Sequence, residues 1–312
     1  MKFRILIIAL LLCVGLMAEN DDIGTTGFAF LKTNYSARAA AMADAYTGLS
    51  NDANAVFFNT AGLGQLTGKQ ASVSYMNYFD EIQTGSAVYA IPLNPKTSIA
   101  TFLKYMNGNA TRTLSNAAGD YLGTSGTFGF SNTVVGFGAS RYINDMLHLG
   151  VNVKFLLDIL DNNTASGIAT DLSLIHQTTN KNLKLGVAIK NLGKQISSYT
   201  DSNYTENFPN IICVGFSYHP DEKLFATLDI YKPQAADFSG KIGLEYQLHP
   251  LLALRGGYKT NAADWKAGGD AEIFSGISMG MGLNWQKYIF DYAVISGGDL
   301  GLLNSITISY KF

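Results

Sequence analysis

The chain ends in Gly301-Leu-Leu-Asn-Ser-Ile-Thr-Ile-Ser-Tyr-Lys-Phe312, and from Ser305 onward polar and apolar residues alternate without interruption. Successive side chains of a β-strand point to opposite faces, so this stretch predicts a strand with one apolar and one polar face. The apolar face ends on Tyr310 and the terminal Phe312. A strand at the surface of a soluble sheet can alternate in the same way, so the decision depends on the rest of the chain.

Segments of the same kind recur from residue 69 onward, separated by turn residues and almost without helical periodicity. Residues 146–157, for example, place Leu149 and Val151 on one face and His148 and Asn152 on the other. A strand that crosses a membrane needs about 9–11 residues with this alternation. We predict about 14 strands, an even number as in single-chain bacterial barrels. The predicted strands are residues 69–78, 85–93, 97–106, 127–142, 146–157, 164–177, 181–192, 209–218, 223–231, 238–248, 251–259, 275–285, 287–294 and 301–312.

The composition favours a membrane-spanning all-β protein over a soluble sandwich. Only 15% of the residues are charged, whereas about a quarter is usual for a soluble domain. No stretch after the first 18 residues approaches the length of apolar sequence that a membrane-spanning helix needs. Backbone groups cannot stay unpaired in lipid, so a sheet in that environment must close on itself. We therefore predict that residues 67–312 form a transmembrane antiparallel β-barrel.

The predicted connections alternate between short and long. Short turns are expected on one rim, at residues 142–146, 218–222, 247–250 and 284–287. Longer loops are expected on the other rim, at residues 107–126, 193–208, 232–237 and 260–274. This asymmetry is typical of short periplasmic turns and long extracellular loops. The loop at 107–126 is expected either to cover the extracellular mouth or to form a surface loop.

The amino terminus predicts export. Lys2 and Arg4 precede an apolar run over residues 5–17, and Ala18 offers a small residue for cleavage. We predict that residues 1–18 are a signal peptide that is removed, and that the protein is located in the outer membrane of a Gram-negative-type bacterium. Cys213 would then be the remaining cysteine, which excludes an intrachain disulfide. The net charge of −2 provides no basic surface for nucleic acid.

Residues 19–66 differ from the rest of the chain. Residues 36–46 are rich in alanine and predict a short helix capped by Ser36. The stretch SARAA at 36–40 is followed by DAY at 44–46, NDA at 51–53, FFN at 57–59 and AGL at 61–63. Together these motifs resemble the start of the PorV and PorQ outer-membrane proteins, which are themselves similar to the FadL long-chain fatty-acid transporters. The sequence departs from that pattern at Thr60, where the family has proline, and at Asn51, where it often has aspartate.

The resemblance implies that residues 19–66 form a helical hatch that plugs the barrel lumen. The motif residues assigned to this plug are Ser36, Arg38, Asp44, Tyr46, Asp52, Phe58, Asn59, Gly62 and Leu63. We expect the plug charges to pair with polar side chains of the barrel interior. The candidates for that role are Lys154, Asp171, Lys184, Lys241, Glu245, Arg255 and Asp291. Glycines at inward strand positions indicate close approach of another backbone, and they are Gly150, Gly186, Gly215 and Gly243.

Motifs for catalysis or metal binding are missing from the sequence. The four histidines are isolated, and neither His-Glu-x-x-His nor Cys-x-x-Cys spacing occurs. The Gly-x-Ser-x-Gly pattern of a serine hydrolase does not occur either. We therefore predict a non-enzymatic protein without a cofactor or a metal site.

Three functions remain open at this stage. Resemblance to PorV favours a partner or shuttle in type IX-like protein secretion, with the secretion translocon or secreted cargo as partners. The alternative is a FadL-like passive transporter of long-chain fatty acids or other hydrophobic molecules, with Ile211, Phe225 and Phe137 as inward apolar residues. A plain structural or diffusion barrel is disfavoured, because residues 19–66 would plug the lumen.

Outer-membrane lipid and the barrel-assembly machinery are expected partners in every case. An alternating strand that closes on a terminal phenylalanine resembles the assembly signal of bacterial outer-membrane barrels. We therefore interpret Tyr310 and Phe312 as the residues that the assembly machinery recognises.

Overall fold

The computed structural model describes residues 26–33, 35–79, 82–200, 205–234, 237–260 and 269–312. The predicted signal peptide lies outside the described residues. Among the described residues, no helix is long and apolar enough to cross a membrane.

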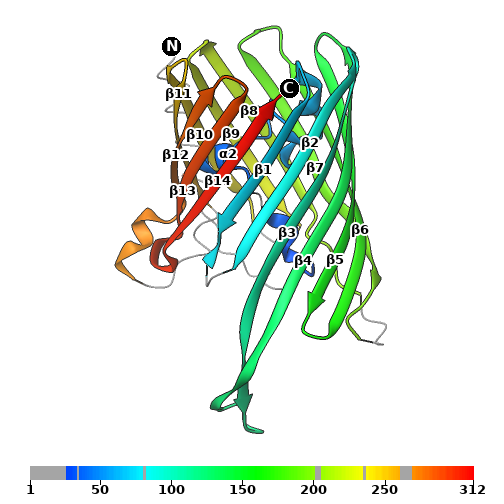
Figure 1. The fold of residues 1–312 in the computed structure, drawn as a ribbon, viewed down its shortest axis with the longest axis vertical. Coiled ribbons are helices and arrows are strands. Elements are labelled where there is room, and N and C mark those ends of the chain that lie inside the picture. The colour runs from blue at the N-terminus through cyan, green and yellow to red at the C-terminus, as the bar shows by residue number, and fades with distance from the viewer. Residues whose placement is uncertain (1–25, 34, 80–81, 201–204, 235–236, 261–268) are drawn as a thin grey trace.

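Fourteen antiparallel strands form one closed barrel, in which each strand pairs with its neighbours in sequence and β1 pairs with β14 (Figure 1). The prediction of an all-β, 14-stranded barrel is therefore confirmed. The strands are β1 (Gln70–Asn77), β2 (Gln83–Asn94), β3 (Thr97–Ser115), β4 (Tyr121–Asn144), β5 (Leu147–Leu160), β6 (Asn163–Gln177), β7 (Leu183–Ser197), β8 (Ile211–Asp221), β9 (Leu224–Pro233), β10 (Ser239–His249), β11 (Leu252–Lys259), β12 (Ile277–Trp285), β13 (Tyr288–Ser296) and β14 (Leu302–Lys311).

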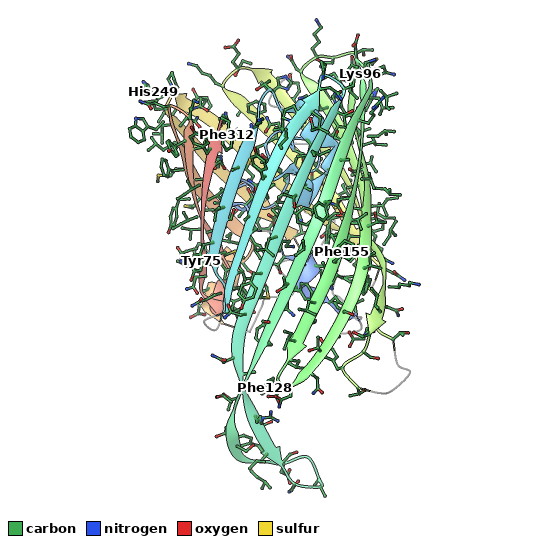
Figure 2. All side chains as sticks on the ribbon, turned by 45° about the vertical axis from the view of Figure 1, so that its right-hand side comes forward. Tyr75, Lys96, Phe128, Phe155, His249 and Phe312 are labelled. Carbon is green, nitrogen blue, oxygen red and sulfur yellow. The ribbon has the colours of Figure 1, made fainter. Side chains whose placement is uncertain are left out.

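The alternation in sequence becomes an apolar outer wall and a polar inner wall. On β14, Ser305 and Thr307 are fully buried inside the barrel, whereas Ile306 and Ile308 are exposed on its outside. The same division holds around the barrel, and Figure 2 labels Tyr75 and Phe155 among its exposed side chains. Other exposed apolar side chains on the strands are Val73, Leu103, Val151, Leu254, Met281 and Phe290. An outer surface of this kind fits a lipid environment, because it places apolar side chains where hydrocarbon would contact them.

The last strand, β14, closes the barrel by pairing with β1. β14 pairs with β1 from Gln70 opposite Lys311 to Asn77 opposite Asn304. Beyond the strand, the Phe312 ring lies edge-on to Tyr310, with 4.8 Å between ring centroids. The backbone N–H of Phe312 donates a hydrogen bond to the Lys69 carbonyl oxygen at 3.1 Å. These contacts hold the terminal aromatic residue against the wall at the rim that carries the short turns (Figure 2).

The predicted short turns all occur on one rim, but the predicted long loop at 107–126 is wrong. β3 and β4 continue as a paired hairpin as far as Ser115 opposite Tyr121, and this hairpin projects beyond the other strands (Figure 1). It therefore does not cover the mouth. Its threonine-rich arms favour a strand. Between them, the Asn116 side-chain oxygen accepts hydrogen bonds from the Ala118 and Asp120 N–H groups, each at 2.9 Å, and shapes the turn.

On the same rim as this hairpin, the described part of the connections contains two short 3₁₀ helices. They are η5 (Asp270–Phe274), between β11 and β12, and η6 (Gly298–Leu300), between β13 and β14. The helices η5 and η6 contact each other. The connection between β13 and β14 is therefore not a bare loop, but packs against its neighbour.

Residues 26–33 and 35–66, here called the lumenal segment, lie inside the barrel. They contain η1 (Ala29–Lys32), α2 (Ala37–Ala41), α3 (Ala55–Phe58) and η2 (Thr60–Gln65). α2 contacts β11 to β14, whereas η2 contacts β2 to β6 on the other side of the barrel. Nearly every side chain from residue 35 to 63 is buried. The segment therefore crosses the lumen from one wall to the other.

The helix predicted over residues 36–46 is shorter in the structure. The Ser36 side chain accepts a hydrogen bond from the Ala39 N–H, as predicted for its cap, but α2 ends at Ala41. Ala43 and Asp44 then adopt positive φ angles of 53° and 59°, which end the helix. The Ala43 N–H donates both to the Ser278 hydroxyl of β12 at 2.9 Å and to the Ala40 carbonyl oxygen at 3.0 Å. A barrel side chain thus shares this N–H with a local carbonyl group just after the helix.

The inward glycines make room for the lumenal segment, as predicted. A β-carbon at each position would overlap an atom of that segment, and the positions are Gly150, Gly186, Gly215 and Gly243. At Gly150, for example, it would overlap the backbone of Thr60 and Ala61. The absence of a side chain therefore lets η2 lie directly against β5.

Gly256 and Gly257 of β11 offer a matched test of this packing. A β-carbon at Gly257 would lie 2.6 Å from the Ala43 nitrogen, whereas one at Gly256 would meet no atom closer than 3.9 Å. We expect Gly257→Val to destabilise the docked segment by about 1–3 kcal/mol and to expose it to protease in the folded barrel. Gly256→Val should leave the digestion pattern unchanged. Equal cleavage of the two variants would contradict the packing described here.

Candidate lumenal site

Arg38 is the centre of an ion chain that joins the lumenal segment to three strands. Its guanidinium donates two hydrogen bonds to Glu245 of β10, each at 2.8 Å, and contacts Asp52 at 3.2 Å. Glu245 also accepts a hydrogen bond from Arg255 of β11 at 2.6 Å. Arg255 in turn donates to Asp291 of β13 at 2.7 Å. Because the charges alternate in sign, each buried charge has an oppositely charged neighbour.

Tyr46 and Asn51 complete the surroundings of Arg38. The Arg38 guanidinium donates to the Tyr46 hydroxyl at 2.8 Å and to the Asn51 side-chain oxygen at 2.7 Å. The Tyr46 hydroxyl donates to Asp52 at 2.7 Å. Burial lowers the pKa of Arg38, but Glu245, Tyr46 and Asp52 together hold it well above its ordinary value. Burial also raises the pKa of Tyr46, so both groups keep their protons at neutral pH.

A second polar cluster lies on β5, β6 and β7. The Lys154 ammonium forms an ion pair with Asp171 at 2.6 Å and donates to the Asn191 side-chain oxygen at 2.6 Å. Asp171 also accepts a hydrogen bond from Asn152 at 3.0 Å. The Asn152 amide lies 3.1 Å from the Val56 carbonyl oxygen of α3 and donates to it. This cluster therefore binds the lumenal segment to the wall that lies across from the Arg38 chain.

Three further charged residues of the strands hold the segment through its backbone. Lys104 of β3 donates to the Thr33 carbonyl oxygen at 2.5 Å, and Lys190 of β7 donates to the Phe57 carbonyl oxygen at 2.8 Å. Asp229 of β9 accepts hydrogen bonds from the Tyr46 and Thr47 N–H groups at 3.1 and 2.9 Å. The sequence-based candidates did not include these three strand residues. The available signal was their charge at the inward position of an alternating strand.

The other motif residues shape the segment itself. The Asn59 amide donates to the Thr47 and Leu174 carbonyl oxygens at 3.0 and 2.9 Å. The Phe58 ring lies edge-on to Tyr46, with 5.2 Å between centroids. Leu63 is fully buried, and a β-carbon at Gly62 would overlap the Ser50 carbonyl oxygen. Asn59 thus joins the segment to β6, and Gly62 leaves no room for a β-carbon.

The remaining predicted charges have different partners from those expected. Asp52 pairs with Arg38 of its own segment and not with a strand. Asp44 Oδ1 has no hydrogen-bond partner among the described residues. Lys184 donates to the Gln65 side-chain oxygen. The Lys241 ammonium lies 4.5 Å from the centre of the Tyr231 ring.

Apolar side chains fill the lumen nearer the long-loop rim. We call them the apolar lumenal layer, and they are Phe102, Met106, Val134, Leu156, Ile295 and Leu303 from the strands, with Phe28, Phe30, Phe57 and Phe208. Along β5, Leu156 lies beyond Asn152 and Lys154 toward that rim. Ile295 likewise lies beyond Asp291 along β13. On β3, however, the buried Lys104 lies between Phe102 and Met106 and pairs in register with Val134, so polar and apolar side chains alternate along this wall.

Of the three apolar residues predicted to face inward, one faces the other way. Ile211 is buried, and Phe225 packs against the apolar cluster inside the barrel. Phe137 is 58% exposed on the outer wall, so the prediction for this residue is wrong. Its neighbours Gly136 and Gly138 take the inward positions of β4, which leaves the phenylalanine on the lipid-facing side.

Replacement of Arg38 tests the ion chain. Arg38→Ala removes an ionic partner from the buried Glu245 and from the half-buried Asp52, and breaking a buried pair costs about 3–5 kcal/mol. We expect the variant to raise ion conductance in planar bilayers, because the lumenal segment is held less firmly. The control is Arg112→Ala. Arg112 lies on the projecting hairpin, and its replacement removes only an exposed ion pair with Asp161. Unchanged conductance of Arg38→Ala would contradict an anchoring role.

Comparison with known proteins finds similarity in fold and not in sequence family. No protein-family model matches the chain, and no curated protein matches it. The fold is similar to that of the CymD monoaromatic hydrocarbon channel, with a TM-score of 0.64, 10% identity and coverage of 89% of this chain and 98% of the other. The Pseudomonas putida toluene transporter TodX gives a TM-score of 0.59, 13% identity and coverage of 86% and 95%.

A Pseudomonas aeruginosa FadL homologue has a similar fold as well, with a TM-score of 0.58, 11% identity and coverage of 86% and 96%. Each similarity extends over almost the whole of the known barrel. The chain therefore has the fold of FadL-type barrels. A specific likeness to the PorV or PorQ proteins is not shown by these similarities.

Proposed function

We propose that this protein is an outer-membrane channel for small hydrophobic molecules, closed by its lumenal segment. In this proposal residues 1–18 are a signal peptide, residues 19–66 are the plug and residues 67–312 are the barrel. Outer-membrane lipid surrounds the apolar wall, and the barrel-assembly machinery recognises Tyr310 and Phe312. The short turns face the periplasm and the projecting hairpin faces outward.

The observation that carries this proposal is the apolar lumenal layer. The interior of a membrane barrel is ordinarily polar, because inward and outward side chains alternate in polarity. Here Phe102, Met106, Val134 and Leu156 occupy inward positions of three adjacent strands. An apolar lining desolvates a hydrophobic molecule at little cost, whereas it opposes the entry of ions and sugars.

The fold comparison adds independent support. The similar barrels include proteins described as a toluene transporter and as monoaromatic hydrocarbon channels. At 10–13% identity the likeness concerns fold alone, so it does not identify a ligand. The structural alternative is that the apolar lumenal layer only packs against the lumenal segment and holds it in place. Uptake measurements separate these two explanations.

The proposal predicts faster uptake of hydrophobic solutes by cells that express the protein. We expect radiolabelled toluene and oleate to enter such cells several-fold faster than cells in which the gene is deleted. A sugar of similar mass should enter both at the same rate. No difference for either hydrophobic probe would reject the proposal.

Two matched variants connect the uptake to the lumen. Met106→Gln places an amide in the apolar lumenal layer, and Met281→Gln makes the same change on the outer wall. Because a buried amide without a partner costs about 1–3 kcal/mol, Met106→Gln should slow hydrophobic uptake. Met281→Gln should retain it, provided that heat-modified migration in gels shows both barrels to be folded.

A role as a PorV-like partner in protein secretion is the second candidate, and the projecting hairpin is the observation that favours it. Leu114, Tyr121 and Leu122 are exposed near the hairpin tip. An isolated two-stranded hairpin is marginally stable in water, so contact with another protein would stabilise it. Mass spectrometry of the protein purified in mild detergent from its own membrane tests this role. A stoichiometric translocon subunit or secreted protein would support it, and lipid without any protein partner would reject it.

A further inference from the structure

Two adjoining grooves lie on the outer wall of the barrel. One, of about 600 Å³, lies over β4 to β7, and the other, of about 470 Å³, lies over β2 to β5. Ala139 and Val151 line both grooves, so the two meet, and we call them together the outer groove. Its lining also includes the outward apolar side chains of Leu149, Leu172 and Phe137, which are all exposed.

A β-bulge in β7 bends the wall at the outer groove. Ile189 faces outward in register with Leu172 of β6, but the next two residues, Lys190 and Asn191, both point into the lumen. Regular alternation would place one of them on the outside. Because a bulge bends its strand and increases the local twist, the outer face departs from a regular cylinder beside Ile189. The outer groove therefore accompanies the same irregularity that brings Asn191 to Lys154 inside the barrel.

A small side chain deepens the outer groove on β4. The outward residues of this strand near the short-turn rim are Phe137, Ala139 and Arg141. Because alanine ends at its β-carbon, it leaves space between the larger phenylalanine and arginine side chains. The outer groove therefore extends from Arg141 at the rim toward the middle of the wall. An acyl chain takes this direction when it enters a bilayer from the headgroup region.

The rim end of the outer groove carries positive charge. Arg141 donates a hydrogen bond to the Thr97 hydroxyl at 3.2 Å, and among the described residues it takes part in no ion pair. Lys96 lies in the turn between β2 and β3 (Figure 2), and the Tyr142 N–H donates to its carbonyl oxygen at 2.8 Å, which holds this turn beside β4. Asp145, in the turn after β4, accepts a hydrogen bond from the Tyr142 hydroxyl. The charges of Arg141, Lys96 and Asp145 therefore sum to a positive value.

The occupant of the outer groove must combine apolar chains with an anion at the rim. A hydrocarbon would cover the apolar lining, because burial of apolar surface is favourable, but it would leave Arg141 without a counter-ion. An inorganic anion would contact only the rim. The planar guanidinium presents donors that match two oxygens of a phosphate, and the Thr97 hydroxyl keeps its own proton to donate. A glycerophospholipid has both parts, and its two acyl chains correspond to the two grooves.

We propose that the outer groove binds one glycerophospholipid molecule, with its phosphate at Arg141 and Thr97 and one acyl chain in each groove. The two chains diverge at Ala139, where the grooves meet. Lys96 attracts the phosphate from the neighbouring turn, and salt weakens this attraction because the lysine is exposed. The inference goes beyond the proposed channel, because the lipid lies outside the lumen and is bound rather than transported.

Native mass spectrometry of the purified full-length protein in mild detergent tests the proposal, with dioleoylphosphatidylglycerol and dioleoylglycerol as probes. The two probes have the same acyl chains, and only the first carries a phosphate. Hydrogen bonds between charged groups are about twice as strong as neutral ones, so we expect a single phosphatidylglycerol to bind about tenfold more tightly than dioleoylglycerol. An excess of glycerol 3-phosphate, which has no acyl chain, should not displace it.

Two pairs of variants assign the binding to the outer groove. Arg141→Gln should weaken phosphatidylglycerol about tenfold and leave dioleoylglycerol unchanged, whereas Lys287→Gln, in the turn between β12 and β13 on the same rim, should alter neither probe. Ala139→Phe fills the groove and should weaken both probes. Its control is Ala226→Phe on β9, because Ala226 pairs with the exposed Leu244 and so lies on the outer wall away from the groove. Heat-modified migration in gels shows whether each barrel is folded.

Equal affinity for the two probes would overturn the inference, because the phosphate would then contribute nothing. Displacement by glycerol 3-phosphate would also overturn it, since the acyl chains would be unnecessary. The same holds if Lys287→Gln weakens phosphatidylglycerol as much as Arg141→Gln, or if Ala139→Phe leaves both probes bound. None of these results changes the hydrophobic uptake predicted above. Normal lipid binding without toluene uptake would reject the proposed channel and retain the lipid site.

Discussion

The antiparallel pairing of β1 with β14 is the interaction on which the rest of the structure depends. Every other strand pairs with a neighbour in sequence, so this single long-range pairing removes both free edges of the sheet. A free edge would expose unpaired N–H and C=O groups, which lipid cannot satisfy. Closure also separates an inside from an outside. Only then does the alternation of Ser305, Ile306, Thr307 and Ile308 place polar side chains in a lumen and apolar ones on an outer wall.

Closure creates a lumen that fourteen strands make too wide for their own side chains to fill. The lumenal segment occupies this space, and its small residues allow it to do so. Gly150 and Gly243 remove side chains where η2 and the turn after α2 approach the wall. Polar contacts then hold the segment at both walls. Arg38 donates to Glu245 of β10. On the other wall, the Val56 carbonyl oxygen accepts from Asn152 of β5 and the Phe57 carbonyl oxygen from Lys190 of β7. Many of these contacts use backbone carbonyl groups of the segment, so the wall recognises its path as well as its side chains.

Alternation in polarity was sufficient to predict the strands, because a two-residue period specifies the orientation of every side chain relative to the wall. It could not predict partners across the lumen. The contact of Arg38 with Glu245 depends on how the segment lies among strands more than 200 residues away along the chain. The end of α2 was equally hidden, because it lies where Ser278 of β12 accepts a hydrogen bond from the Ala43 N–H. Phe137 was misassigned because aromatic character alone indicates neither face. The hairpin was predicted as a loop because segments rich in glycine, serine and threonine occur both in loops and in strands.

Alternation in polarity also explains how this barrel can share a fold with hydrocarbon channels at 10–13% identity. Each position of the wall requires only that its residue be polar or apolar. Many residues meet this requirement, so sequence identity can be low while the fold is the same. The lumen has no such constraint. A lysine and a leucine are interchangeable to the closed sheet when they face inward at the rim, but they differ completely to a ligand. Selectivity must therefore be argued from the lumenal side chains themselves. In this chain Ile295 and Leu303 line the same small cavity as Lys241 and Asp44, so apolar and charged side chains face one space.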